Sequence, residues 1–382
     1  MNLFLTRIFN NPLQAPTIQP KQDRRYVPNF NGLEKDTFVR TTPTFAGRSS
    51  KTKAGGVLKE LDDITCPYSG VKMLSGNKMT RVENKLANCP DLYESMQVLN
   101  PYKSCMQKLE KQIYGEFKVY EKLHPGATAN DCLRELRPEC LAKLRIEEFQ
   151  VLDNIDNISN NLSPVEALKI RRLTTNARKR ILDDKDNQIF KRKDLLDNLE
   201  VVTQNFKNKK LVHDISEVAN KLPKSSTNFN AFVVKYADRS QTEIMARLLR
   251  PSVASIEHIT PKSINPDHTL ANFMLAAKDW NTDRGNMPLP EYIDKHPNIP
   301  VYSQRYANDI IKAIHNKKLQ NVDWYPYMLK EKLYNESEGI IQIKLDNYKI
   351  SEEEAFKDAA PELIEKYNDV KEANKVIEPK QF

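Results

Sequence analysis

Apolar side chains between residues 83 and 250 recur at the spacing of amphipathic helices. The clearest run is formed by Met106, Leu109, Ile113, Phe117 and Tyr120. Positions three or four apart share one face of an α-helix, so these side chains form a single apolar stripe. His124-Pro125-Gly126 ends the run, because proline and glycine both interrupt helices. We therefore predict a helix that stops at this tripeptide.

Other segments carry the same signature, with recognisable starts. Ser163-Pro164-Val165-Glu166 combines an N-cap serine, a proline in the first turn and a glutamate at the capping-box position. Ser240 and Glu243 repeat the capping-box spacing. Helices are also predicted over 131–152 (interrupted or restarted at Pro138), 187–206, 301–319 and the acidic 351–382.

A different pattern occupies residues 251–286. Val253, Ile256 and Ile259 flank a Glu-His pair and predict a short strand, followed by Pro261 and a polar loop. Residues 272 and 281 would face opposite ways on one continuous helix, because nine steps of roughly 100° make half a turn. The two positions converge if 273–275 is extended and a helix runs over 276–284, with Gly285 at its C′ position. The alternative is one ordinary amphipathic helix over 270–284.

The polar residues of this stretch occur in the order Glu257-His258, Asn272, Asn281, and then Arg284-Gly285-Asn286. This order resembles the HNH, or ββα-metal, endonuclease family, and most closely the HNH domain of RNA-guided CRISPR nucleases. The family delivers an acidic residue and a histidine from a strand, an Asn or His from a loop, and a last Asn or His from a short helix.

The resemblance implies hydrolysis of phosphodiester bonds. A neutral His258 would be the general base that takes a proton from water. Glu257 and Asn281 would offer oxygen ligands to one Mg²⁺ or Mn²⁺ ion, and Asn272 would hold the loop and the histidine in position. From their charge and position, Arg284 or Lys262 would steady the phosphate.

Residues 64–74 form a second informative stretch. Cys66-Pro67-Tyr68-Ser69-Gly70, followed by an apolar run, resembles the first hairpin of HNH proteins, where zinc-binding members carry a CxxC pair. Ser69 is a poor zinc ligand, so we expect no zinc. About 190 residues separate Cys66 from His258. A helical insertion would therefore split the nuclease fold, the alternative being a buried cysteine in an ordinary turn.

The predicted fold class is mainly α with a small ββα-metal (HNH) core and a helical insertion or domain between the two parts of the motif. The predicted divisions are a basic extended arm over 1–60, a first hairpin over 61–82, a helical domain over 83–250, the ββα motif over 251–300, and an α-rich C-terminal region over 301–382.

The charge distribution favours a polyanionic partner. The chain of 382 residues has a net charge of +8, and residues 1–60 carry 10 Lys or Arg against 4 Asp or Glu. We predict DNA as the partner, with RNA as the alternative. The arm would follow DNA or serve as a solubilising tail. The basic residues of 169–193 would contact phosphates or form a solvated, ion-paired helix surface.

Other features restrict the compartment. No apolar run approaches the 18 or so residues of a membrane span, so no membrane partner is expected. Five cysteines without a CxxC pair argue against a disulfide framework and indicate a reducing, intracellular (cytoplasmic) location. The first 16 residues lack a clear signal-peptide core, and a transit peptide is a weaker interpretation. A phage or mobile-element origin would suit an HNH protein.

Two functional alternatives stay open. A non-catalytic nucleic-acid-binding or assembly protein would keep an HNH-like fold without requiring a metal. A nuclease effector would be controlled by a protein partner bound to the helical region.

Overall fold

The computed structural model describes residues 56–184, 189–264 and 267–380, so most of the predicted basic arm lies outside the described residues. The described chain is mainly helical with one small antiparallel sheet of two strands, as predicted. Helices precede the sheet at α2 Gly56–Lys59, α3 Gly76–Leu86, α4 Leu92–Leu99, α5 Lys108–Leu123, α6 Ala129–Ser159, α7 Pro164–Leu182, α8 Arg192–Thr203, α9 Lys209–Ala219, α10 Phe229–Tyr236 and α11 Gln241–Arg247. The sheet and the helices after it are β1 Ala254–His258, β2 Phe273–Ala277, α12 Lys278–Arg284, α13 Leu289–Lys295, α14 Ile299–His315, α15 Tyr325–Glu336, α16 Glu352–Phe356 and α17 Pro361–Asn374.

Local signals set most helix ends. Ser163 and Glu166 form the expected capping box at the start of α7, and Thr128 with Asp131 forms another at the start of α6. Helix α5 ends at Leu123, before the predicted stop. The prediction for 131–152 differs from the structure, because α6 runs unbroken through Pro138. The lost hydrogen bond at the proline is tolerated in a helix whose two halves pack into different cores.

Among the described residues, the buried apolar side chains form three clusters. The first core joins residues 58–73 to residues 259–367. The second core joins residues 74–144 to residues 231–249. The third core occupies residues 152–222. Residues 58–73, the predicted ββα motif and the predicted C-terminal region therefore contribute to one core, while the rest of the predicted hairpin belongs to the second.

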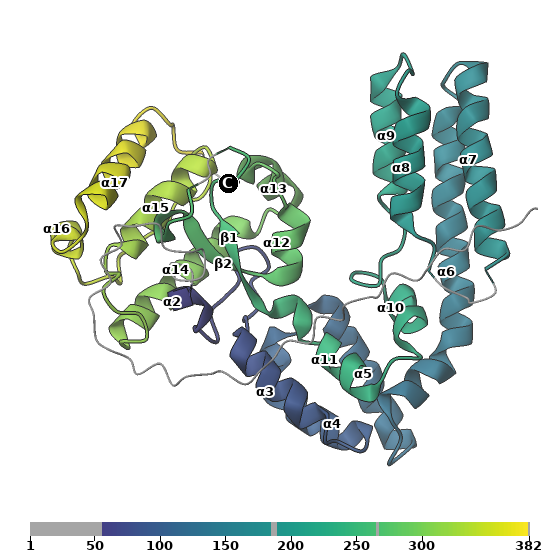
Figure 1. Cartoon of the computed structure of the whole chain (residues 1–382), viewed down its shortest axis with the longest axis horizontal. Coiled ribbons are helices and arrows are strands. Elements are labelled where there is room, and N and C mark those ends of the chain that lie inside the picture. The colour runs from purple at the N-terminus through teal and green to yellow at the C-terminus, as the bar shows by residue number, and fades with distance from the viewer. Residues whose placement is uncertain (1–55, 185–188, 265–266, 381–382) are drawn as a thin grey trace, which may run out of the picture. The chain divides into compact units, whose positions relative to one another are not determined.

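Helices α6 to α9, here called the four-helix region, surround the third core. Helix α6 packs against α7 and α9, while α8 packs against α7 and α9, so the four run side by side (Figure 1). Ion pairs tie neighbouring helices together. Arg178 of α7, for example, contacts Asp153 and Asp156 of α6, at 2.7 Å each. Arg180 of α7 likewise pairs with Asp194 of α8 at 2.8 Å, so this part of the basic surface is ion-paired, and phosphate contact by residues 169–193 stays a prediction.

The two strands pair antiparallel, with His258 opposite Phe273 and Ala254 opposite Ala277. Helix α12 begins directly after β2 and ends at Gly285, whose φ of 53° is a left-handed value that glycine adopts without strain. The extended run and the short helix that stops before Gly285 are thus present, but the strand continues through Ala277 and the helix begins two residues later than predicted.

Residues 64–74 lie against this unit despite their distance in sequence. Thr65 pairs with Lys72 in a small hairpin, and Leu74 pairs with Val253 just before β1. The turn requires Gly70, because a Cβ there would lie 2.6 Å from the Tyr302 ring. The chain between the hairpin and β1 is helical, which is the arrangement expected of a helical insertion.

None of the helices in the part of the chain that the structure describes combines the length and the apolarity needed to cross a bilayer.

Candidate active site

The side chain of Asn281 holds helix α12 against strand β1. Asn281 donates its amide nitrogen to Ser255 Oγ at 2.9 Å and to the Ile256 carbonyl at 3.0 Å. Asn281 lies nine positions after Asn272, and β2 separates the two, so Asn281 binds β1 while Asn272 lies at the loop that follows β1. The amide oxygen is the end of Asn281 that could ligate a cation.

His258 ends β1 with a half-buried ring. The ring packs edge-on against Phe273, its cross-strand neighbour, with centroids 4.8 Å apart. Its Nε2 lies 3.1 Å from Nδ1 of His268, a residue of the loop between the strands. His258 is thus a titratable side chain held by contacts on the sheet and on the loop.

Asn272 closes the loop between β1 and β2. Its side-chain oxygen accepts from the Thr260 N–H at 2.8 Å, and its nitrogen donates to the carbonyls of Thr260 at 3.2 Å and Asp267 at 3.1 Å. The residue is fully buried. Because one amide joins the start of the loop to the residue before His268, its position suits the expected role of holding the loop.

The C-terminal helices also hold this loop. Asp267 accepts from the Thr269 N–H at 2.9 Å and pairs with Lys366 of α17 at 3.1 Å. Burial acts to raise the pKa of Asp267, but these hydrogen bonds and the lysine outweigh it, so the pKa lies below its usual value. Thr260 donates its hydroxyl to Glu336 of α15 at 2.5 Å.

Glu257 faces away from His258, because neighbouring strand residues point to opposite faces. Its carboxylate is buried, accepts from the Tyr68 hydroxyl at 3.1 Å, and forms an ion pair with Arg284. Burial raises the pKa of Glu257, and Arg284 opposes that rise. The side chain is therefore occupied by protein partners, unlike the open metal ligand expected from the sequence.

Arg284 is also buried, whereas the sequence predicted that it would contact the phosphate. Only 2% of it is exposed, and its guanidinium donates to the carbonyls of His258 and Ile259 at 3.0 Å each. A further bond of 2.9 Å reaches the Tyr68 hydroxyl. Arg284 thus fixes the backbone on which His258 stands, and a substrate cannot reach it without unfolding of this network. Lys262, the other residue expected at the phosphate, is exposed to solvent in the turn after Pro261.

Cys66 and Ser69 lie in the hairpin behind this network. Cys66 is fully buried and its sulfur accepts from the Ala277 N–H at 3.3 Å. Burial raises the pKa of its thiol, which opposes formation of a metal-binding thiolate.

The donor set does not fit a Mg²⁺ site as it is arranged. Oxygen donors of the right kind are present in Glu257 and Asn281, but the carboxylate is committed to Arg284 and Tyr68. Within residues 56–184, 189–264 and 267–380, no cluster of three or more His, Cys, Asp or Glu side chains has the arrangement of a metal site. We therefore assign no chemical step to a metal.

Sequence reasoning missed His268, Tyr68 and Lys366. His268 stands ten residues after His258 in a polar loop, and a second histidine inside the motif was the signal available. Tyr68 stood inside the noted Cys-Pro-Tyr-Ser-Gly run, but nothing in the sequence showed that it meets Glu257. Lys366 gave no local signal in the acidic C-terminal segment.

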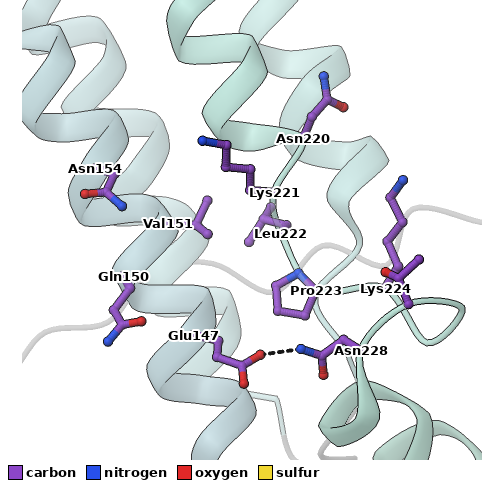
Figure 2. Close-up of a pocket in the computed structure, with 11 residues that line it drawn as sticks. Glu147, Gln150, Val151, Asn154, Asn220, Lys221, Leu222, Pro223, Lys224 and Asn228 are labelled. Carbon is purple, nitrogen blue, oxygen red and sulfur yellow. Dashed lines mark hydrogen bonds between the residues drawn. The ribbon is translucent and has the colours of Figure 1, made fainter. Parts of the chain in front are cut away.

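A cavity of about 430 Å³ lies away from this site, between α6 and the segment that joins α9 to α10 (Figure 2). Its wall includes Glu147, which accepts from Asn228 at 2.6 Å and from Asn230 at 2.8 Å. Lys221 and Lys224 line the other side. Both carboxylate oxygens of Glu147 are thus engaged by asparagine amides.

Comparisons of this chain with protein-family models, with curated proteins and with solved structures found no match.

Proposed function

We propose that this protein is an HNH-type endonuclease that hydrolyses phosphodiester bonds in DNA with His258 as the general base. The observation that carries the proposal is the ββα unit itself. A strand ends in His258, a buried Asn272 closes the loop after it, and Asn281 on the following helix binds the strand backbone. These three residues have the order and secondary structure that the HNH resemblance requires.

The reaction follows from a histidine at this position. His258 takes a proton from water, and the hydroxide formed attacks phosphorus. The bond from phosphorus to the leaving oxygen breaks, and solvent returns a proton to that oxygen. His258 then releases its proton to solvent. Arg284 contributes indirectly, because it fixes the carbonyls of His258 and Ile259. The exposed Lys262 is available to attract the phosphate backbone.

The HNH resemblance also implies a divalent metal. The ion pair of Glu257 with Arg284 argues against that part of the resemblance, so metal dependence is left to the assay. Supercoiled plasmid, single-stranded DNA and RNA should be incubated with pure protein in Mg²⁺, in Mn²⁺ and in EDTA. The His258→Ala variant is compared with His213→Ala, which removes an exposed histidine of α9 in the four-helix region.

The expected result is cleavage of plasmid that falls by about 10²–10⁴-fold in His258→Ala. His213→Ala should cleave like the wild type. The ratio of nicked to linear product then reports whether one or both strands are cut. Cleavage that persists unchanged in His258→Ala would remove His258 from the mechanism.

One observation favours a second function, a non-catalytic nucleic-acid-binding protein. The buried Glu257–Arg284 pair leaves the ββα unit without an open carboxylate beside His258. A binding protein would show salt-sensitive affinity for DNA without cleavage of any of the three substrates. Its affinity would be the same in EDTA and in His258→Ala.

A further inference from the structure

The pair formed by His258 and His268 is the feature of the site that the HNH resemblance does not explain. The rings stand edge-on, with centroids 5.3 Å apart and planes at 82°, and Nε2 of His258 is 3.1 Å from Nδ1 of His268. Two ring nitrogens at this distance form a hydrogen bond when one carries a proton and the other presents its lone pair. The contact therefore couples the tautomers of the two rings, because either Nε2 of His258 or Nδ1 of His268 carries the shared proton.

Both members of the pair are held by the surrounding structure. The backbone of His258 is fixed by Arg284, and its ring rests on Phe273. The segment carrying His268 is fixed at Asp267, whose carbonyl accepts from Asn272 and whose carboxylate pairs with Lys366. The contact thus joins two anchored groups. Two freely moving surface side chains would seldom keep such a distance, because ordering each costs side-chain entropy.

We propose that His268 is a positioning residue that orients His258 by accepting a hydrogen bond from its Nε2–H. This inference rests on the proposed function. In this proposal Nδ1 of His258 is the atom that takes the proton of the attacking water, so it is unprotonated in the neutral ring. The proton of the neutral ring consequently resides on Nε2 and is donated to Nδ1 of His268.

The pair also stabilises the charge that appears during the reaction. When water gives its proton to Nδ1, His258 becomes an imidazolium with protons on both nitrogens. The lone pair of His268 Nδ1 faces the Nε2–H of that cation, and charge-assisted hydrogen bonds are stronger than neutral ones. No proton is lost or gained by His268 in this step. Its role is that of the third group which orients a catalytic base in other hydrolases.

Three variants test the proposal. His268→Phe keeps an aromatic ring but removes the acceptor. His268→Asn places an amide oxygen near the position of Nδ1 and restores an acceptor. His315→Phe is the matched control, because it makes the same substitution at an exposed histidine of α14 that stacks on Tyr348.

The expected kinetic result is a loss of about 10–100-fold in kcat for His268→Phe with KM unchanged, as for other residues that orient a functional histidine. His268→Asn should recover most of the loss, and His315→Phe should match the wild type. Equal losses in the Phe and Asn variants would overturn the proposal, since the acceptor would then be irrelevant.

The ring nitrogens of His258 give a readout that does not depend on cleavage. In ¹⁵N-labelled full-length protein, Nε2 of His258 should carry a slowly exchanging proton and Nδ1 should show the shift of an unprotonated nitrogen. That proton should exchange rapidly in His268→Phe and stay protected in His268→Asn. A proton found on Nδ1 in the wild type would overturn the proposal even if the protein cleaves DNA. A wild type that cleaves nothing but shows the expected nitrogen pattern would refute the proposed function and support the pairing.

Discussion

The ββα unit and the four-helix region are stabilised by contacts of very different range along the chain. In the ββα unit, the Tyr68–Glu257 and Tyr68–Arg284 bonds join residues 189 and 216 positions apart. In the four-helix region, the capping boxes join residues three apart, and the Arg178–Asp156 pair spans 22. The candidate site is therefore assembled from distant segments, whereas the four helices are defined largely by their own sequences.

The first core is built from two segments far apart in the sequence, residues 58–73 and residues 259–367. The hairpin at 64–74 and the strand at 254–258 meet through Leu74 and Val253, and helical chain fills the interval between them. The entropic cost of closing such a long loop rises only slowly with its length. The cost is offset by the apolar side chains that residues 58–73 and 259–367 bury together in the first core.

The largest expected effect on stability is at the buried ion pair. Arg284→Ala leaves Glu257 buried without its cation and should cost roughly 3–5 kcal/mol in the free energy of unfolding. Arg178→Ala removes a partly exposed pair of the four-helix region and should cost at most about 1 kcal/mol. Urea unfolding followed by tryptophan fluorescence measures the first core, because Trp324 belongs to it and Trp280 packs against it.

Circular dichroism in the same titration reports the helices of all three cores. Arg284→Ala should lower the fluorescence midpoint and leave much of the helical signal in place. Equal losses of stability in the two arginine variants would show that the two regions do not differ as their contacts indicate. Activity lost in Arg284→Ala without loss of stability would instead point to a direct role at the substrate.

A smaller effect is expected from replacing two asparagines that hold local structure, Asn272 in the loop between the strands and Asn228 at the start of α10. Asn272→Ala leaves the buried Thr260 N–H without its acceptor and should cost roughly 1–3 kcal/mol. Asn228→Ala removes the N-cap of α10, for which about 1 kcal/mol is typical. In the plasmid assay, Asn272→Ala should also slow cleavage, while Asn228→Ala should not. A loss of cleavage in Asn228→Ala alone would contradict the placement of the site.

The smallest effect is a dependence on pH at the start of α6. Hydrogen bonds from the backbone N–H and the hydroxyl of Thr128 lower the pKa of Asp131 below its usual 3.8. The unfolded chain then binds this proton more readily than the folded one does. The stabilisation is therefore complete above the unfolded pKa and is lost as pH falls through the lower folded pKa.

Asp131→Asn should remove this acid-dependent part of the stability and leave the rest of the pH profile unchanged. Thermal melts of the two proteins between pH 5 and pH 3, about the range set by the unfolded pKa, would measure it. The fluorescence of the first core should respond less than the helical signal. A pH profile that is identical in the two proteins would mean that the Thr128–Asp131 box does not contribute.

The sequence predicted local structure well and side-chain partners poorly. The helix start at Ser163, the helix end at Leu123 and the end of α12 at Gly285 follow from caps, proline and glycine within a few residues, whereas α12 begins two residues after its predicted start. Pro138 was an exception, because packing of both halves of α6 outweighed its intrinsic cost as a helix breaker. At the candidate site, Asn272 and Asn281 lie where their spacing suggested, since one break in the helix is a local event.

The amino-acid sequence by itself determined that a strand carrying Glu257 and His258 is followed by a loop, a second strand and a short helix. It also predicted helices over residues 83–250. Tertiary structure decided what those side chains do. Glu257 bonds to Tyr68 and Arg284, and the His258 ring lies next to that of His268. A buried charge or polar group requires a partner, and here other segments of the chain supply it. No spacing rule within the motif encodes a partner 189 residues away.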